Sequence, residues 1–188
     1  MKFYVVLGVF FISLLAGCQT PGTKKTETKP EAVAAAAEKQ FTGTGTLVIE
    51  PVRFKKDIYV REAVKQQCNL DGKLSQFIQQ YAAGQYANII TDGSRAPRNA
   101  DVLKVEIDEV QGGGGGAWSG AKAVRISGVL KKRGRVVGDF KARRYSGGGF
   151  FGAYKGTCAI MGRCVKALGR DVAEWLQHPT KRAALGDM

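Results

Sequence analysis

Three stretches in the middle of the chain constrain the fold more than any other feature. Between residues 102 and 110, apolar side chains alternate with charged ones, and stretches 121–130 and 136–145 repeat this period. A period of two is typical of strands with one buried face. Arg133-Gly134, between the last two stretches, predicts a tight turn. We therefore expect three long strands, the last two of which form a hairpin.

Two other stretches have the helical period. From 69 to 83, apolar residues recur every three to four positions, and Gly84 follows the last of them. Stretch 157–177 repeats the pattern and is followed by Pro179, which cannot continue a helix. We expect one helix at each place.

Two short apolar runs, 46–54 and 86–91, predict further strands. The element order is then β-α-β-β-β-β-α, which is an α+β fold with a mixed, mostly antiparallel sheet of about five strands and two helices packed on it. We expect this domain to span 41–177 and a polar carboxyl-terminal tail to span 178–188. If each of the last three strand connections reverses the chain, the second helix runs opposite to the first.

This element order is similar to that of small α+β domains in certain envelope accessory lipoproteins. They are the curli-secretion lipoprotein class and the amino-terminal domain of the Tol system's β-propeller protein. The glycine- and aromatic-rich stretch 147–158 and the helix end 171–176 also resemble a family of uncharacterised bacterial lipoproteins. That second resemblance implies an envelope protein and brings no known activity.

The amino-terminal residues have the order of a secretory signal. Lys2 precedes the uncharged stretch 3–15, which is shorter than the roughly 20 residues of a membrane span. Residues 15–18 read Leu-Ala-Gly-Cys and resemble the lipobox of bacterial lipoproteins. The resemblance implies that signal peptide 1–17 is removed and that Cys18 carries diacylglycerol and a further acyl chain such as palmitate.

The residues after the lipobox predict where the anchor lies. Two acyl chains already hold a protein stably at a membrane. In lipobox proteins an Asp after the cysteine implies inner-membrane retention, so Gln19 implies the outer membrane, on its periplasmic side. Segment 18–40 then reads as the lipidated cysteine and a flexible tether, because it is polar and nearly without large apolar residues.

The chain is basic, with 29 Lys and Arg against 16 Asp and Glu. This balance favours anionic surroundings such as lipid headgroups, lipopolysaccharide, cell-wall polymers or nucleic acid. A periplasmic address argues against nucleic acid, and apart from Phe140 and Tyr145 the basic hairpin lacks the interleaved aromatic residues of a stacking platform. The basic residues of the predicted hairpin either protect a sheet edge from pairing or form an anionic-ligand patch; they are Lys131, Lys132, Arg133, Arg135, Lys141, Arg143 and Arg144.

Two glycine clusters flank this hairpin. The run 112–116 follows a strand, but another strand rather than a helix comes next, so a hairpin connection suits it better than a phosphate-binding loop. The second cluster surrounds Phe150, Phe151 and Tyr154. These aromatic residues either fold back over the core or form a partner loop that contacts another protein or subunit.

Groups able to perform catalysis are sparse in the sequence. His178 is the single histidine, and no clustered carboxylate motif accompanies it, so we predict no metal site, no cofactor and no histidine-based triad. Glu106 and Asp108 share the polar face of a strand, where solvated charge is the usual explanation. We therefore expect a protein that is not an enzyme.

Three cysteines remain besides Cys18, and an oxidising compartment favours one disulfide among them. Within a regular helix Cys158 and Cys164 would lie about 9 Å apart, beyond the roughly 7 Å limit, unless the helix begins late. With helices running in opposite directions, Cys68 lies nearer Cys164 than Cys158. We therefore expect Cys164 to be oxidised, with Cys68 favoured over Cys158 as its partner.

The sequence leaves three functions open. The first is a non-catalytic envelope lipoprotein that acts as a binding or assembly module with a protein partner or a second copy. The second is binding of an anionic lipid or glycan through the basic hairpin. The third, an enzyme, has the least support.

Overall fold

The alternating stretches form the centre of one mixed β-sheet. The computed structural model describes residues 43–91, 96–112, 122–147 and 156–188. The strand order is β3-β1-β4-β5-β6-β7, and β2 pairs with β4 off this path. The strands are β1 (Thr46–Ile49), β2 (Arg53–Phe54), β3 (Asn88–Ile90), β4 (Asp101–Gln111), β5 (Lys122–Lys132), β6 (Arg135–Ser146) and β7 (Ala183–Gly186).

The two long pairings, β4 with β5 and β5 with β6, are antiparallel, whereas the short pairings of β1, β2, β3 and β7 are parallel. Arg133 and Gly134 join β5 to β6 with φ values of 48° and 76°. Two positive φ values are those of a type I′ turn, whose twist matches that of the flanking strands. The predicted tight turn is confirmed.

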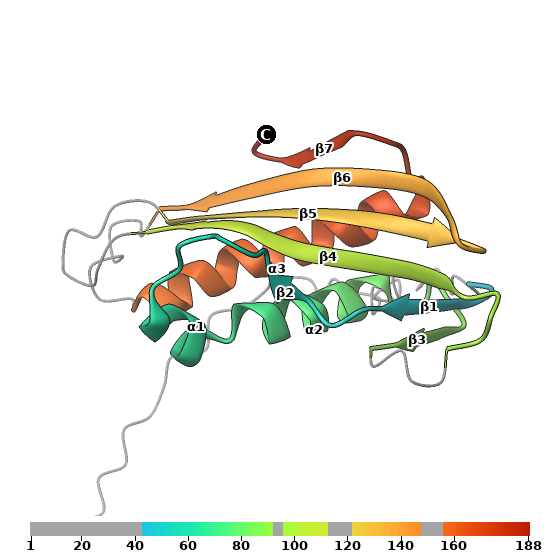
Figure 1. Ribbon diagram of the computed structural model, residues 1–188, viewed down its shortest axis with the longest axis horizontal. Coiled ribbons are helices and arrows are strands. Elements are labelled where there is room, and N and C mark those ends of the chain that lie inside the picture. The colour runs from blue at the N-terminus through green and yellow to red at the C-terminus, as the bar shows by residue number, and fades with distance from the viewer. Residues whose placement is uncertain (1–42, 92–95, 113–121, 148–155) are drawn as a thin grey trace, which may run out of the picture. The chain divides into compact units, whose positions relative to one another are not determined.

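All three helices cover the same face of the sheet (Figure 1). They are α1 (Glu62–Cys68), α2 (Leu70–Ala82) and α3 (Thr157–Gln177). The apolar stripe of α3 packs on the strands, and Phe140 of β6 meets Trp175 edge to face with ring centroids 4.8 Å apart. This single layer of helices buries the core, and no helix of the described residues lies on the other face of the sheet.

The α+β class and the mixed sheet are confirmed, with three corrections. The sheet has seven strands rather than about five, because run 46–54 splits into β1 and β2 and because β7 is added. Helix α1 lies between the predicted strand 46–54 and the predicted helix 69–83, where we predicted no element. The predicted polar tail is wrong: Ala183 pairs with Phe140 at the sheet edge, and Leu185 packs against the core.

The expected helix directions are also wrong, and one connection explains the error. Strands β1, β3 and β4 are all parallel, so the segment between β3 and β4 does not reverse the chain. The chain therefore reverses once less often than we expected, and α3 runs in the direction opposite to the one predicted. Helices α2 and α3 therefore run parallel, with Cys68 and Cys158 near the start of each.

The disulfide follows from this geometry. Cys68 bonds Cys158, with Cα atoms 4.8 Å apart. Cys164 is a buried free cysteine whose Sγ lies 3.7 Å from the carbonyl oxygen of Lys122. The expectation that Cys164 is oxidised is wrong, because the parallel helices bring the two early cysteines together and leave Cys164 against β5.

Among the described residues, no helix has both the length and the apolar character that a membrane crossing requires.

Candidate functional site

The helix-free face of the long strands is the candidate binding surface, called the open face below. On β4 a bulge at Asp108 places two consecutive acids, Asp108 and Glu109, on this face. Alternation and strand register assign the other members. The open face consists of Lys104, Glu106, Asp108, Glu109, Arg125, Ser127, Val129, Lys131, Val136, Asp139, Lys141, Arg143 and Tyr145.

Two acids of the open face are paired with neighbouring cations. Lys104 Nζ lies 3.1 Å from Glu106 Oε1. Arg125 Nη1 lies 3.2 Å from Glu109 Oε2 on the adjacent strand. These pairs are half exposed, so water screens them and each adds little stability. Their main effect is to hold the side chains in a fixed arrangement across β4 and β5.

A shallow hollow of about 490 Å³ lies within the open face. Its wall includes three cations, Lys55, Arg125 and Lys141, and one carboxylate, Asp108. Ser127 Oγ lies 2.9 Å from Asp108 Oδ1, and Lys55 Nζ lies 3.9 Å from the same oxygen. The single acid of the hollow is therefore already engaged by its neighbours.

Two arginines lie directly opposite each other beside this hollow. Arg125 on β5 is the cross-strand partner of Arg143 on β6. Arg143 donates to Gln111 Oε1 at 3.1 Å, and its guanidinium carbon lies 4.2 Å from the centroid of the Tyr145 ring. Like charges directly opposite across strands destabilise a sheet, and the pairing of Arg125 with Glu109 offsets part of this repulsion.

The hairpin turn places the remaining basic residues apart from the hollow. Lys131, Arg133 and Arg135 are exposed. Lys132 points to the helix side, where its Nζ lies 3.0 Å from Asp101 Oδ2. The predicted basic residues are thus divided between the turn and both faces of the sheet.

A polar pocket of about 450 Å³ lies on the helix side near the turn. Tyr86 donates a long hydrogen bond of 3.5 Å to Asp101. Burial, and then the charge of Asp101, raise the pKa of Tyr86 to about 12. His178 is the residue just after α3 and lines this pocket beside Gln177.

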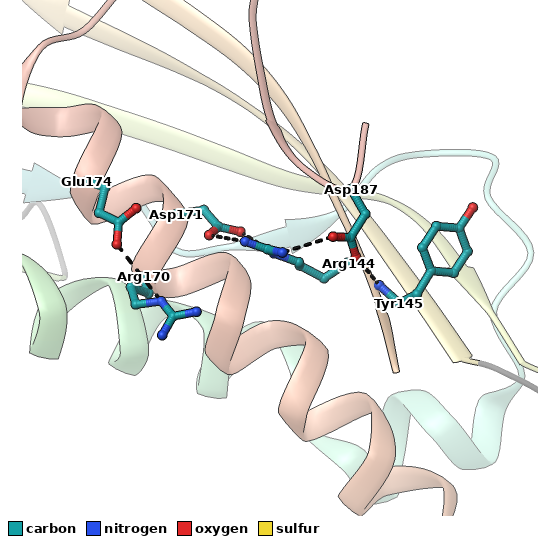
Figure 2. A network of polar contacts seen from close by, with 6 residues as sticks. All are labelled: Arg144, Tyr145, Arg170, Asp171, Glu174 and Asp187. Carbon is teal, nitrogen blue, oxygen red and sulfur yellow. Dashed lines mark hydrogen bonds and ion pairs between the residues drawn. The ribbon is translucent and has the colours of Figure 1, made fainter. Parts of the chain in front are cut away.

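Arg144 does not belong to any basic surface, which corrects the prediction. Its side chain points to the helix side, and Nε and Nη2 both contact the carboxylate of Asp171 at 2.7 Å, as Figure 2 shows. Nη1 contacts Asp187 at 2.9 Å, and Asp187 also accepts from the backbone N–H of Tyr145. The hydrogen bonds with Asp171 raise the pKa of Arg144 further above its ordinary value. This network joins β6, α3 and the end of β7.

The sequence carries one signal for this network, the position of Asp171. Asp171 lies on the apolar stripe of α3, between Leu168 and Trp175, and its side chain is only 8% exposed. An acid at such a position needs a buried cationic partner. The partner, Arg144, is distant in sequence and was indistinguishable from the other arginines of the hairpin.

Several predicted sites lie outside the described residues. These are the lipidation site Cys18 and the aromatic residues Phe150, Phe151 and Tyr154 of the expected partner loop. Within the part of the chain that the structure describes, no three side chains of His, Cys, Asp or Glu are grouped as a metal site would require.

Comparisons with known proteins were made by sequence and by structure, and they gave different results. No family model and no curated protein matches the chain. Solved structures do match. The hypothetical protein CT253 from Chlamydia trachomatis is 10% identical with a TM-score of 0.49, and the alignment covers 72% of this chain and 96% of that one.

Two further structures match less closely. A PelC dodecamer from Paraburkholderia phytofirmans gives 13% identity and a TM-score of 0.45, over 68% of this chain and 87% of that chain. The lipoprotein GNA1162 from Neisseria meningitidis gives 14% identity and a TM-score of 0.39, over 69% and 99%. At these values the likeness is one of general backbone arrangement.

Proposed function

We propose that this chain is a lipid-anchored lipoprotein of the bacterial envelope whose α+β domain is a non-catalytic binding or assembly module. Its open face is the binding surface, and its partner is a protein of the envelope or a second copy of the chain. The observation that carries the proposal is the one-sided sheet: in the described part of the chain, the three helices lie on one face and none lies on the opposite face of β4–β6 (Figure 1).

The sequence supports the anchor. Residues 15–18 have the form of a lipobox, and segment 19–40 is polar enough to act as a tether. A flexible chain of this length reaches several nanometres from a membrane surface. The domain is therefore free to meet a partner in the periplasm while Cys18 holds it at the outer membrane.

The arrangement of charges supports binding. Glu106 is paired with Lys104, and Glu109 is paired with Arg125. These ion pairs hold a fixed pattern of charge on the open face that a partner can match.

A site-specific crosslink tests the binding surface. A photoreactive residue at Val129, in the middle of the open face, should yield a discrete crosslinked species in intact cells. The same residue at Lys166, exposed on α3, should not. Crosslinks from Lys166 alone would place the partner on the helix layer and refute the proposal.

A second substitution tests the anchor. Cys18→Ala should leave an unlipidated protein that keeps its signal peptide, because lipid addition precedes cleavage in lipobox proteins. The measurement is acyl labelling together with partitioning into detergent. Labelling equal to that of the wild type would refute the lipoprotein assignment.

A further inference from the structure

We propose that the hollow of the open face binds one phosphate group, held by Arg125 and Lys141. This inference rests on the proposed function, because it uses the open face as a binding surface. A phosphate site is an additional property of the open face, because binding of a protein partner does not require it. The phosphate group can belong to a lipid headgroup or to free phosphate.

The first support is the charge of the hollow. Its lining residues are the three cations Lys55, Arg125 and Lys141, together with Asp108, Ser127 and Met188. Arg125 also pairs with Glu109 at 3.2 Å. Asp108 is engaged by Ser127 and Lys55. Lys141 forms no ion pair within the described part of the chain. Its ammonium group is therefore available to an anion that enters the hollow.

The second support comes from the arginine pair beside it. Arg125 and Arg143 are direct cross-strand neighbours. The Nε atoms of both are buried and have no hydrogen-bond acceptor among the described residues. A buried donor without an acceptor is unfavourable, and so is a like-charged pair. An anion in the hollow beside Arg125 would further reduce the repulsion between the two guanidinium groups, which Glu109 already lowers at Arg125.

The chemistry of these groups favours phosphate among anions. Guanidinium groups present parallel N–H donors that match the oxygens of phosphate, and lysine adds a compact point charge. A phosphate monoester carries about −1.5 to −2 charges at pH 7, so several cations can share it. The half-exposed position of the hollow also leaves room for the rest of a headgroup.

Calorimetric titration of the detergent-solubilised, lipidated protein tests the site. The two probes are inorganic phosphate and glycerol 3-phosphate, each added at constant ionic strength with chloride as the competing anion. We expect saturable binding at one site. Tighter binding of glycerol 3-phosphate would assign the site to a headgroup, and equal or tighter binding of inorganic phosphate would assign it to the free ion.

Two variants locate the binding. Lys141→Gln should weaken phosphate binding by about fivefold or more, as expected for loss of one charge-assisted hydrogen bond. Lys131→Gln is the matched control, since it removes the same charge from the same face at the hairpin turn, and it should change the affinity by less than about twofold. Unfolding midpoints in chloride alone should be the same for both variants, which shows that both are folded.

Two results would overturn the phosphate site. One is the absence of any heat beyond that given by chloride of equal ionic strength. The other is an equal loss of affinity in the Lys141 and Lys131 variants, which would indicate only general attraction by the basic chain. If crosslinking at Val129 succeeds while phosphate does not bind, this inference fails and the proposed function stands; the opposite pair of results removes the protein partner and keeps the phosphate site.

Discussion

Cys68 and Cys158 lie with their Cα atoms 4.8 Å apart and are joined by a disulfide, although 90 positions separate them in the chain. The bond links the end of α1 to the first turn of α3. It therefore fixes the two main helices, α2 and α3, side by side at their amino-terminal ends. In the chain-entropy account, closing a loop of this length restricts the unfolded chain strongly.

Removal of this disulfide should be the most damaging change to the cysteines. The double variant Cys68→Ala, Cys158→Ala should lose about 4 to 5 kcal/mol in free energy of unfolding. Cys164→Ala, which leaves the bond intact, should lose about 1 kcal/mol. Denaturant unfolding measures both, and non-reducing peptide mapping should show Cys68 linked to Cys158. A linked peptide containing Cys164 would contradict the structure.

The two acids that contact Arg144 should differ in their effect on stability. Asp171→Ala leaves a partly buried guanidinium without its main partner and should destabilise the fold by about 3 kcal/mol. Asp187→Ala removes a more exposed contact and should lose about 1 kcal/mol. The control is Glu174→Ala, which breaks the exposed 3.9 Å pair with Arg170 on the same helix (Figure 2) and should change stability by less than about 0.5 kcal/mol. Equal effects for Asp171 and Glu174 would show that the network does not support the fold.

Two glycines of α3 should respond in opposite directions to alanine. A Cβ at Gly169 would lie 2.5 Å from Cβ of Phe77, so Gly169→Ala must push α2 and α3 apart and should destabilise by about 1 to 3 kcal/mol. A Cβ at Gly162 meets no atom within 4 Å, so Gly162→Ala should stabilise by up to about 1 kcal/mol through helix propensity. Thermal unfolding of both variants tests this, and a loss at Gly162 would mean that the helix is not regular there.

Cys164 should make stability depend on alkaline pH. Burial raises the pKa of its thiol from 9.0 to about 11, so the folded protein holds this proton more tightly than the unfolded chain. The contribution of the protonated Cys164 thiol to the free energy of unfolding is fully present below pH 9 and is lost as the pH rises through 11. Between these values the wild type should lose more stability than Cys164→Ala. Parallel stability curves for the two proteins would show that the thiol is not buried.

The sequence by itself determined most of the local structure. The predicted helix 157–177 coincides with α3, and the three alternating stretches became β4, β5 and β6 with only small changes at their ends. The reason is that side-chain period, turn residues and helix-ending residues act between near neighbours. The type I′ turn at Arg133-Gly134 is the clearest case, since two positive φ values suit the dipeptide that the sequence supplies.

Tertiary structure alone decided how these elements meet. The direction of the chain between β3 and β4 carries no periodic signal, yet it set the direction of α3 and hence which cysteine Cys68 reaches. Strand β7 has only four residues, too few for a pattern, and it exists because β6 offers it an edge. Arg143 and Arg144 are neighbours in sequence, but the alternation of the strand directs one to the open face and the other to Asp171. The two arginines have separate roles because the groups around a charged side chain, rather than its position in the chain, determine its free energy.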